Sequence, residues 1–356
     1  MKLRYWLILF VCSILTFNII TRFPDAIEAF YTNGFYFYLC NVFNTITSLF
    51  PFSVGDILYT IIGLSLIYKF YQIFKKYKGW KKITMACAAL TFKCVVIFYI
   101  LFNISWGLNN FRPTLESQLE IGRGYDQEKL INLTTRLIQR ANLLQLAITN
   151  DSTIAVKLKQ DINTILVDAK KGIEQITFLH QIDNTQSLTI KESLFSLPLT
   201  YMGFSGYINP FTLEAQVNNK IPTLTMIITA SHEMSHQLGF AKESDANFIG
   251  FMAAYNQKDT AYQYAAIIYA LRYCVSNIND KESVEVKALF ETIHPGVKDN
   301  LNENIIFWSE YKNITDSFFK VFYNGFLKLN NQKEGLQSYN KFVDLLINYD
   351  LKNPIL

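Results

Sequence analysis

Three long apolar runs constrain this chain more than any other feature of its sequence. They cover about residues 5–21, 54–74 and 83–107. Each has a length within the roughly 17–25 residues that a helix uses to cross a bilayer. Inside a membrane the backbone has no water to bond with, so runs of this length have to be helical. We therefore predict a membrane domain with three spans over residues 1–108.

Composition places the rest of the chain outside the bilayer. Half of the 356 residues are apolar and only 17% are charged, whereas a soluble domain carries about 25% charged residues. The apolar excess lies in the first 108 residues, so residues 109–356 are expected to form a separate extramembrane domain. The formal charge of +4 is too small and too dispersed to indicate a nucleic-acid partner. The five cysteines include no CxxC pair, so the sequence offers no thiolate metal site.

The start of the chain is expected to remain as a membrane anchor. A signal peptide is the competing interpretation, but the first run ends in Thr21, Arg22 and Phe23, without a small-x-small cleavage site. The segment that follows, residues 24–52, is rich in Phe and Tyr. Because aromatic side chains favour the membrane interface, we predict an interfacial helical hairpin there.

Lysines determine the expected orientation. The loop between the second and third runs contains Lys75, Lys76, Lys78, Lys81 and Lys82. The positive-inside rule places this loop and the N-terminus in the cytoplasm. Three crossings then place everything after Trp106 on the other side. The predicted location is a bacterial inner membrane, with the C-terminal domain in the periplasm.

The extramembrane domain is expected to be largely helical with a small β element. Residues 126–145 and 153–182 show apolar side chains at helical spacing. Glycine and proline punctuate Leu197 to Pro222, which favours short strands or a hairpin. From Thr223 onward the pattern is helical, with breaks expected at Gly239, near Lys258, at 294–296 and at 330–335. The predicted fold class is a mainly α membrane protein.

The most informative motif is His232-Glu233-x-x-His236, the HExxH pattern. Helical residues four apart share one face, so both imidazoles can bind one ion. Zn²⁺ suits this site because it accepts imidazole nitrogen and carboxylate oxygen in tetrahedral geometry. Glu233 can then serve as general base toward a zinc-activated water. HExxH also occurs by chance in long helices, but two of only four histidines in this chain fall at this spacing.

The residues after HExxH indicate a third ligand. Gly239 can end the helix in a left-handed conformation and turn the chain back, which places Glu243 near the start of a second helix. The metzincin pattern would require a histidine at Lys242. The segment Glu243-Ser-Asp-Ala-Asn247 instead resembles the ExxA(D/N) of gluzincins with the intervening insert removed. This resemblance implies Glu243 as zinc ligand and Asn247 as the support of a histidine ligand, although an Asp is common at that position.

A wider set of motifs covers most of the chain. It comprises Pro51–Asp56, Trp106–Asn109, Tyr207–Asn218, Asn324–Lys328 and Glu334–Tyr339. Together with HExxH…ExxAN these motifs resemble an uncharacterised bacterial family of three-span membrane proteins with a zincin-like domain. The resemblance implies a gluzincin-like metallopeptidase-type domain and no particular substrate.

Stabilisation of a developing oxyanion requires a further donor. Tyr207 and His294 are the candidates we name, with a purely structural tyrosine and a solvated turn histidine as the alternatives. His180 is expected to be structural. Residues 207–218 either provide an edge strand for an extended peptide or are plain core β-structure.

The sequence thus predicts a membrane-anchored zinc hydrolase that acts on a peptide or protein, with the lipid bilayer as its other partner. The alternative is a membrane-bound binding or assembly protein in which zinc is a structural staple. Intramembrane proteolysis is excluded because the apolar stretch Ile221 to Ala230 is too short to span a membrane.

Overall fold

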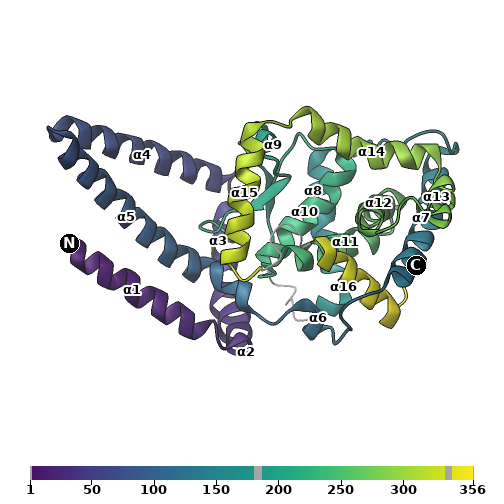
Figure 1. Ribbon diagram of the computed structural model, residues 1–356, viewed down its shortest axis with the longest axis horizontal. Helices are drawn as coiled ribbons and strands as arrows, with labels where there is room; N and C mark the ends of the chain where they lie inside the picture. Colours follow the sequence, from purple (N-terminus) through teal and green to yellow (C-terminus); the bar gives the residue numbers. More distant parts are fainter. Residues whose placement is uncertain (1, 180–186, 333–338, 356) are drawn as a thin grey trace.

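Three long apolar helices project from one end of the molecule (Figure 1). The computed structural model describes residues 2–179, 187–332 and 339–355. The three helices are α1 (Leu3–Ile20), α4 (Val54–Lys76) and α5 (Trp80–Ser105), and each is long and apolar enough to cross a membrane. Little of their apolar surface is buried inside the protein, which indicates a membrane-anchored protein. The third helix ends two residues earlier than expected, because Gly107–Phe111 forms the 3₁₀ helix η2.

The segment between α1 and α4 corrects the predicted hairpin. It is one continuous helical segment, made of α2 (Pro24–Ala26), the π-helix η1 (Ile27–Tyr36) and α3 (Phe37–Thr47). Its buried polar positions include Thr32, Tyr36, Cys40 and Asn44, each four residues after the last. This spacing gives the segment one face to pack on the C-terminal region. The hairpin prediction was wrong because aromatic content was used in place of this periodicity.

The C-terminal region is mostly helical, as predicted. Its helices before the sheet are α6 (Leu115–Gln118), α7 (Gln127–Thr149), α8 (Ile162–Glu174) and the 3₁₀ helix η3 (Thr177–Leu179). Those from residue 223 onward are α10 (Thr223–Gln237), α11 (Glu243–Tyr255), α12 (Thr260–Asn277), α13 (Val284–Glu291), α14 (Pro295–Glu310), α15 (Ile314–Leu329) and α16 (Tyr339–Lys352). The expected breaks at Gly239, Lys258 and 294 are confirmed, whereas those at 278–283 and 311–313 were missed. Residues 153–161 are not helical, because Asp161 caps the start of α8 with its side chain.

A three-stranded sheet lies against α10. Its order is β1-β3-β2, with β1 (Ile190–Glu192) parallel and β2 (Gly206–Ile208) antiparallel to the central β3 (Ala215–Val217). The predicted hairpin within 197–222 is confirmed as β2–β3. The beginning of that stretch instead forms the helix α9 (Ser196–Met202), which Gly203 ends in a left-handed conformation.

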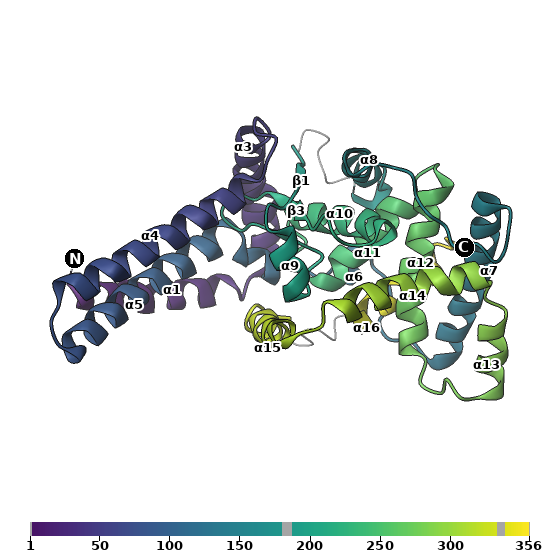
Figure 2. The same ribbon diagram turned by 90° about the horizontal axis from the view of Figure 1, so that it is seen from above.

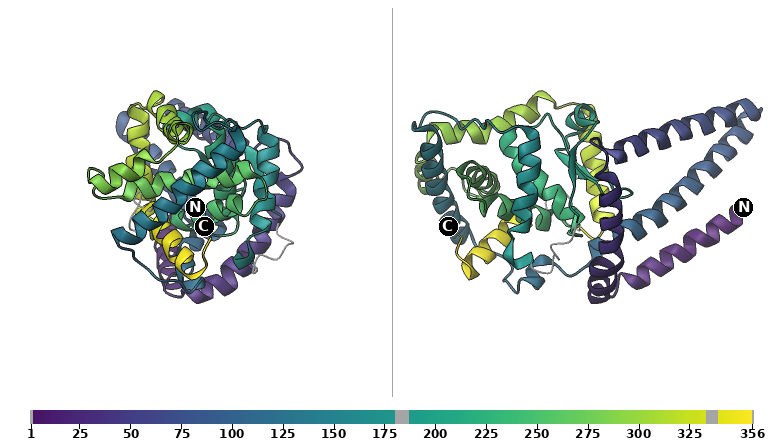
Figure 3. Two further views of the ribbon diagram at one scale, coloured as in Figure 1. Left: turned by 90° about the vertical axis from the view of Figure 1, so that its right-hand side faces the viewer. Right: turned by 180° about the vertical axis from the view of Figure 1, so that it is seen from behind.

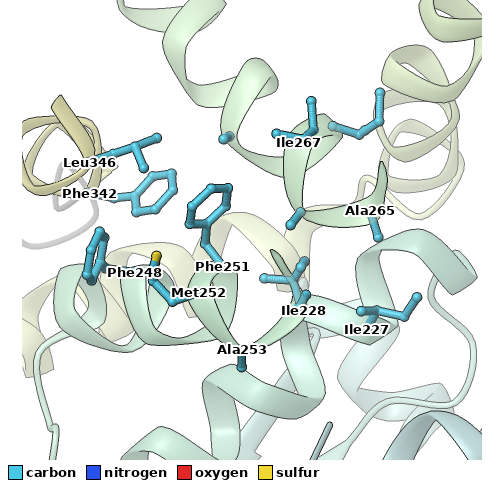
Figure 4. Close-up of a cluster of buried hydrophobic side chains, with 14 of the residues drawn as sticks. Ile227, Ile228, Phe248, Phe251, Met252, Ala253, Ala265, Ile267, Phe342 and Leu346 are labelled. Atoms are coloured by element: carbon cyan, nitrogen blue, oxygen red, sulfur yellow. The ribbon is translucent and has the colours of Figure 1, made fainter. Parts of the chain in front are cut away.

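The hydrophobic core is built around the pair α10 and α11. Side chains of α7, α8, α12 and α16 surround this pair and complete one buried cluster. Figure 4 shows the part where Phe342 and Leu346 of α16 point toward Phe248 and Phe251 of α11. Hydrophobic packing therefore holds the two central helices in position relative to each other.

Residues 24–56 join the apolar helices to the C-terminal region. Glu28 forms an ion pair with Arg112. Asp56, in the first turn of α4, accepts hydrogen bonds from the backbone of Leu194 at 2.7 Å and from Ser193 Oγ at 2.9 Å. Glu214 accepts from the backbone of Gly55 at 2.6 Å. The views from above and behind show α3 and the adjoining ends of α4 and α5 beside the C-terminal region (Figures 2 and 3).

Candidate metal centre

Two histidines of α10 face one another across a single helical turn. The ring centroids of His232 and His236 are 4.7 Å apart, and their planes are nearly perpendicular at 85°. The helix that carries them is almost wholly buried, since it packs on β3, α8, α11 and α12. His236 is buried, whereas the side chain of His232 is 12% exposed.

The turn after α10 brings a carboxylate to both rings. Gly239 has a positive φ of 80°, as expected, and α11 begins at Glu243. The Oε2 atom of Glu243 lies 3.4 Å from His232 Nε2, and its Oε1 lies 3.8 Å from His236 Nε2. Two zinc ligands with bonds of about 2.0–2.1 Å in tetrahedral geometry are roughly 3.3 Å apart. The spacing and the donor types therefore fit a zinc ion held by His232, His236 and Glu243.

Outer hydrogen bonds orient both histidines. Nδ1 of His236 is 2.6 Å from the carbonyl oxygen of Phe240, which accepts its proton. This bond leaves Nε2 with its lone pair toward Glu243. The side chain of Asn247 lies near His232 and acts to raise the pKa of that histidine, and its Oδ1 accepts a hydrogen bond from the Tyr269 hydroxyl at 2.6 Å. The structure thus brings Asn247 to the histidine that the ExxAN resemblance implies it would support.

Glu233 lies in the same site. Its ligand atom and those of the two histidines lie within 4.8 Å of one another. Its side chain packs on Gly206 of β2, where a β-carbon would lie 2.8 Å from Glu233 Oε1. Within the described residues, its buried Oε2 atom has no hydrogen-bond partner. A buried carboxylate oxygen in that condition is suited to accept a proton or to face a cation.

The two carboxylates differ in charge state because their surroundings differ. Burial raises the pKa of Glu233 to about 8, against an opposing effect of His232. Burial also acts to raise the pKa of Glu243, but hydrogen bonds from His232 and Tyr323 and the charges of both histidines outweigh it and lower that pKa to about 2. Glu243 is therefore ionised at neutral pH, whereas the pKa of Glu233 lies near neutral pH, where a carboxyl group can both accept and release a proton.

The two histidines also differ. Burial and the neighbouring His232 lower the pKa of His236 to about 4. Burial acts on His232 in the same direction, but the hydrogen bond to Glu243 and the charges of Glu233 and Glu243 outweigh it and raise the pKa of His232. A metal ion would therefore compete with a proton at His232 and not at His236.

Tyr323 of α15 belongs to the site and was missed in the sequence. Its hydroxyl donates to Glu243 Oε1 at 2.7 Å, and its ring packs edge-on against Phe204. The chain has 21 tyrosines, and nothing in the local pattern distinguishes this one. Gln332 accepts a hydrogen bond from the backbone of Glu243 and so supports the start of α11.

The site lies against the ends of the apolar helices. The ring of Trp106, the first residue after α5, is 6.0 Å from the ring of His236. Tyr36 of η1 donates its hydroxyl to the carbonyl of His236 at 3.2 Å. These contacts place the candidate centre on the side of the domain that faces the predicted membrane.

Two sequence candidates are not brought into the centre. The hydroxyl of Tyr207 donates to Asp56, so this tyrosine serves the junction with α4. His294 precedes α14 and contacts Gln145 of α7 at 3.0 Å. His180 lies outside the described residues, as does most of the motif 334–339.

Comparison with known proteins gives a family and no activity. The family described as "Protein of unknown function (DUF3810)" matches residues 31–347. No curated protein and no solved structure matches the chain.

Proposed function

The chain belongs to the DUF3810 family, whose description assigns no function, and from that premise we propose a function that rests on the site alone. The protein is a membrane-anchored zinc hydrolase of peptide bonds, gluzincin-like in its ligand set. The observation that carries this proposal is the division between two carboxylates, because Glu243 approaches both imidazoles while Glu233, from the same side, has an unpartnered oxygen.

Each residue of the site has a distinct role in this proposal. His232, His236 and Glu243 would hold the zinc, which would supply Lewis acidity toward the peptide carbonyl and the attacking water. Glu233 Oε2 accepts the proton of the attacking water and returns it to the departing amine nitrogen. Tyr323 and Asn247 hold their partners in position through hydrogen bonds.

Strand β2 supports a peptide as the substrate. It is an edge strand of the sheet, and Ser205 and Asn209 direct their backbone groups toward β3. By the alternation of antiparallel strands, Gly206 and Ile208 direct theirs to the open edge. An extended peptide that added to this edge would pass the Glu233 side chain at Gly206.

The decisive variant is Glu233→Gln. It removes the base and leaves all three ligands, so we expect normal zinc content and a hydrolytic rate lower by about 10²–10⁴-fold. The assay uses the full chain in detergent with casein or a peptide library. Glu303→Gln in α14, another glutamate whose pKa is raised by partial desolvation, is the control and should keep its rate.

A structural zinc is the second candidate, and it predicts the opposite pair of results. A staple site is normally closed by four protein ligands and its removal unfolds the domain. Here α10 and α11 are fixed by a core without metal, so we expect a chelator to abolish hydrolysis while the helical signal and unfolding midpoint change little. Full activity of Glu233→Gln, with unfolding on chelation, would leave the staple as the explanation.

A further inference from the structure

Helix α15 carries an apolar face that no part of the described protein covers. Ile314, Phe318, Val321, Phe322 and Leu329 are its large exposed apolar side chains. At 100° per residue these five fall within about a third of the helix circumference. Such a stripe on a solvent-exposed helix is typical of an interaction surface.

The opposite face of α15 is fully engaged with the protein. Leu327 is buried, Tyr323 reaches Glu243, and Phe326 packs against Phe102 with ring centroids 5.7 Å apart. The N-terminus of the helix is also anchored, because Asn313 donates to the carbonyl of Tyr201. The helix is therefore held in place with its apolar stripe turned outward.

The contact with Phe102 sets the level of α15 relative to the apolar helices. Phe102 lies three residues before the end of α5 at Ser105, which is about 4–5 Å of helix. Figures 1 and 2 show α15 beside the ends of α4 and α5, across their direction, with α3 on the other side. Helix α3 and the segment before it also carry exposed Phe30, Tyr38 and Val42. The apolar stripe of α15 thus lies at the same height as the end of α5, where that helix is expected to leave the membrane.

We propose that α15 lies in the membrane–water interface, with its apolar stripe in contact with phospholipid. Lys328 borders the stripe and is exposed, where its ammonium group meets the phosphate groups of lipids. A charged border beside Phe, Val and Leu is the composition of helices that lie on a bilayer. A second copy of the chain could cover an apolar stripe at any height on the domain. The position of this stripe beside the ends of the apolar helices therefore favours the bilayer.

This proposal joins the bilayer to the candidate centre through a single helix. The outer face of α15 contacts lipid, and its inner face supplies the hydroxyl that binds Glu243. It does not depend on the proposed hydrolysis, because the lipid contact is a property of the fold.

Photochemical crosslinking of the full chain in vesicles of phosphatidylethanolamine and phosphatidylglycerol tests the proposal. The photoreactive amino acid p-benzoylphenylalanine replaces Phe322 in α15, Leu64 within α4, or Val284 in α13, one position at a time. All three side chains are exposed, at 62%, 63% and 86%, so the replacements leave the core intact. Mass spectrometry after irradiation identifies what has been captured.

We expect a mass increase of one phospholipid at positions 322 and 64 and none at 284. Absence of a lipid adduct at 322, with an adduct at 64 in the same vesicles, would overturn the proposal. Capture of a second protein chain at 322, or lipid capture at 284 equal to that at 322, would overturn it as well.

Discussion

At the scale of single residues, environment alone separates the two glutamates of the centre. Glu243 receives hydrogen bonds and faces two imidazoles, and its pKa is lowered to about 2. Glu233 is buried against Gly206 with an unpartnered oxygen, and its pKa is raised to about 8. The same side-chain type thus has a lowered pKa at one position and a raised pKa at the other, as the proposed roles of ligand and base require.

Tyr323→Phe tests how far the ligand depends on its hydrogen bond. A bond to a charged group contributes about 1.5–3 kcal/mol, and loss of an outer partner typically weakens metal affinity about 10–100-fold. We expect a loss of zinc affinity in this range, measured by competition with a chelator of known affinity, and no change in helical content.

Tyr311→Phe is the matched control for that variant. Tyr311 follows α14 and packs its ring against Tyr201, away from Glu243. Equal zinc affinity in Tyr323→Phe and in the unmodified protein would show that Glu243 does not need the tyrosine hydroxyl.

The sequence predicts the residues of this centre that lie close together along the chain. It does not predict the residue that tertiary packing brings in from far along the chain. His232, His236 and Glu243 follow from helical spacing and one glycine turn, and Asn247 follows from the ExxAN resemblance, all within sixteen positions. Tyr323 donates to a residue eighty positions earlier, and only tertiary packing decides which of the many tyrosines does so. Tyr207 was misplaced for the same reason, because its partner Asp56 belongs to a membrane helix.

At the scale of elements, the turn from α10 to α11 is the part on which the ligand set depends. Other parts of the chain pack closely against this turn. A β-carbon at Gly239 would lie 2.8 Å from Thr32 Cγ2 and 3.0 Å from Asn109 Oδ1. The N-terminal helical segment therefore packs directly on the turn that delivers Glu243.

Gly239→Ala and Gly124→Ala separate backbone strain from this contact. Both glycines have a φ of +80°, but a β-carbon at Gly124 would meet nothing within 4 Å. A left-handed alanine costs about 1–2 kcal/mol at either site, and crowding at Gly239 adds about 1–3 kcal/mol. We expect Gly239→Ala to lower the midpoint of thermal unfolding further than Gly124→Ala, and it alone to weaken zinc binding. Equal effects of the two variants would show that the segment 24–47 does not press on the turn.

Elements whose own residues specify them were predicted correctly from the sequence. Elements that depend on contacts with distant parts of the chain were not. The three apolar helices and the boundaries at Gly239 and Lys258 depend on length, hydropathy and glycine chemistry. The short strand β1 was missed because its three residues are specified by pairing with β3, more than twenty positions later. The segment 24–47 was misread because its buried face only has meaning beside α10.

At the scale of the whole molecule, orientation decides which compartment the centre faces. The lysine loop at residues 75–82 is predicted to be cytoplasmic. The start of α4, the end of α5 and the C-terminal region would then lie outside the cytoplasm. Alkaline phosphatase fused after Leu356 should therefore be active, and green fluorescent protein at the same position should be dark.

The same two reporters fused after Lys78 provide the control, with the opposite result expected. Fluorescence after Leu356 together with phosphatase activity after Lys78 would reverse the topology and move the proposed hydrolysis into the cytoplasm.

The contact between Tyr323 and Glu243 also has a consequence for the order of assembly during synthesis. A nascent chain that has reached residue 313 already contains both histidines and both glutamates, yet α15 is still to be made. The hydroxyl that binds Glu243 arrives only with one of the last helices, after all three apolar helices have been synthesised. The candidate centre is thus completed only after the synthesis of α15, the helix that supplies the Tyr323 hydroxyl to Glu243.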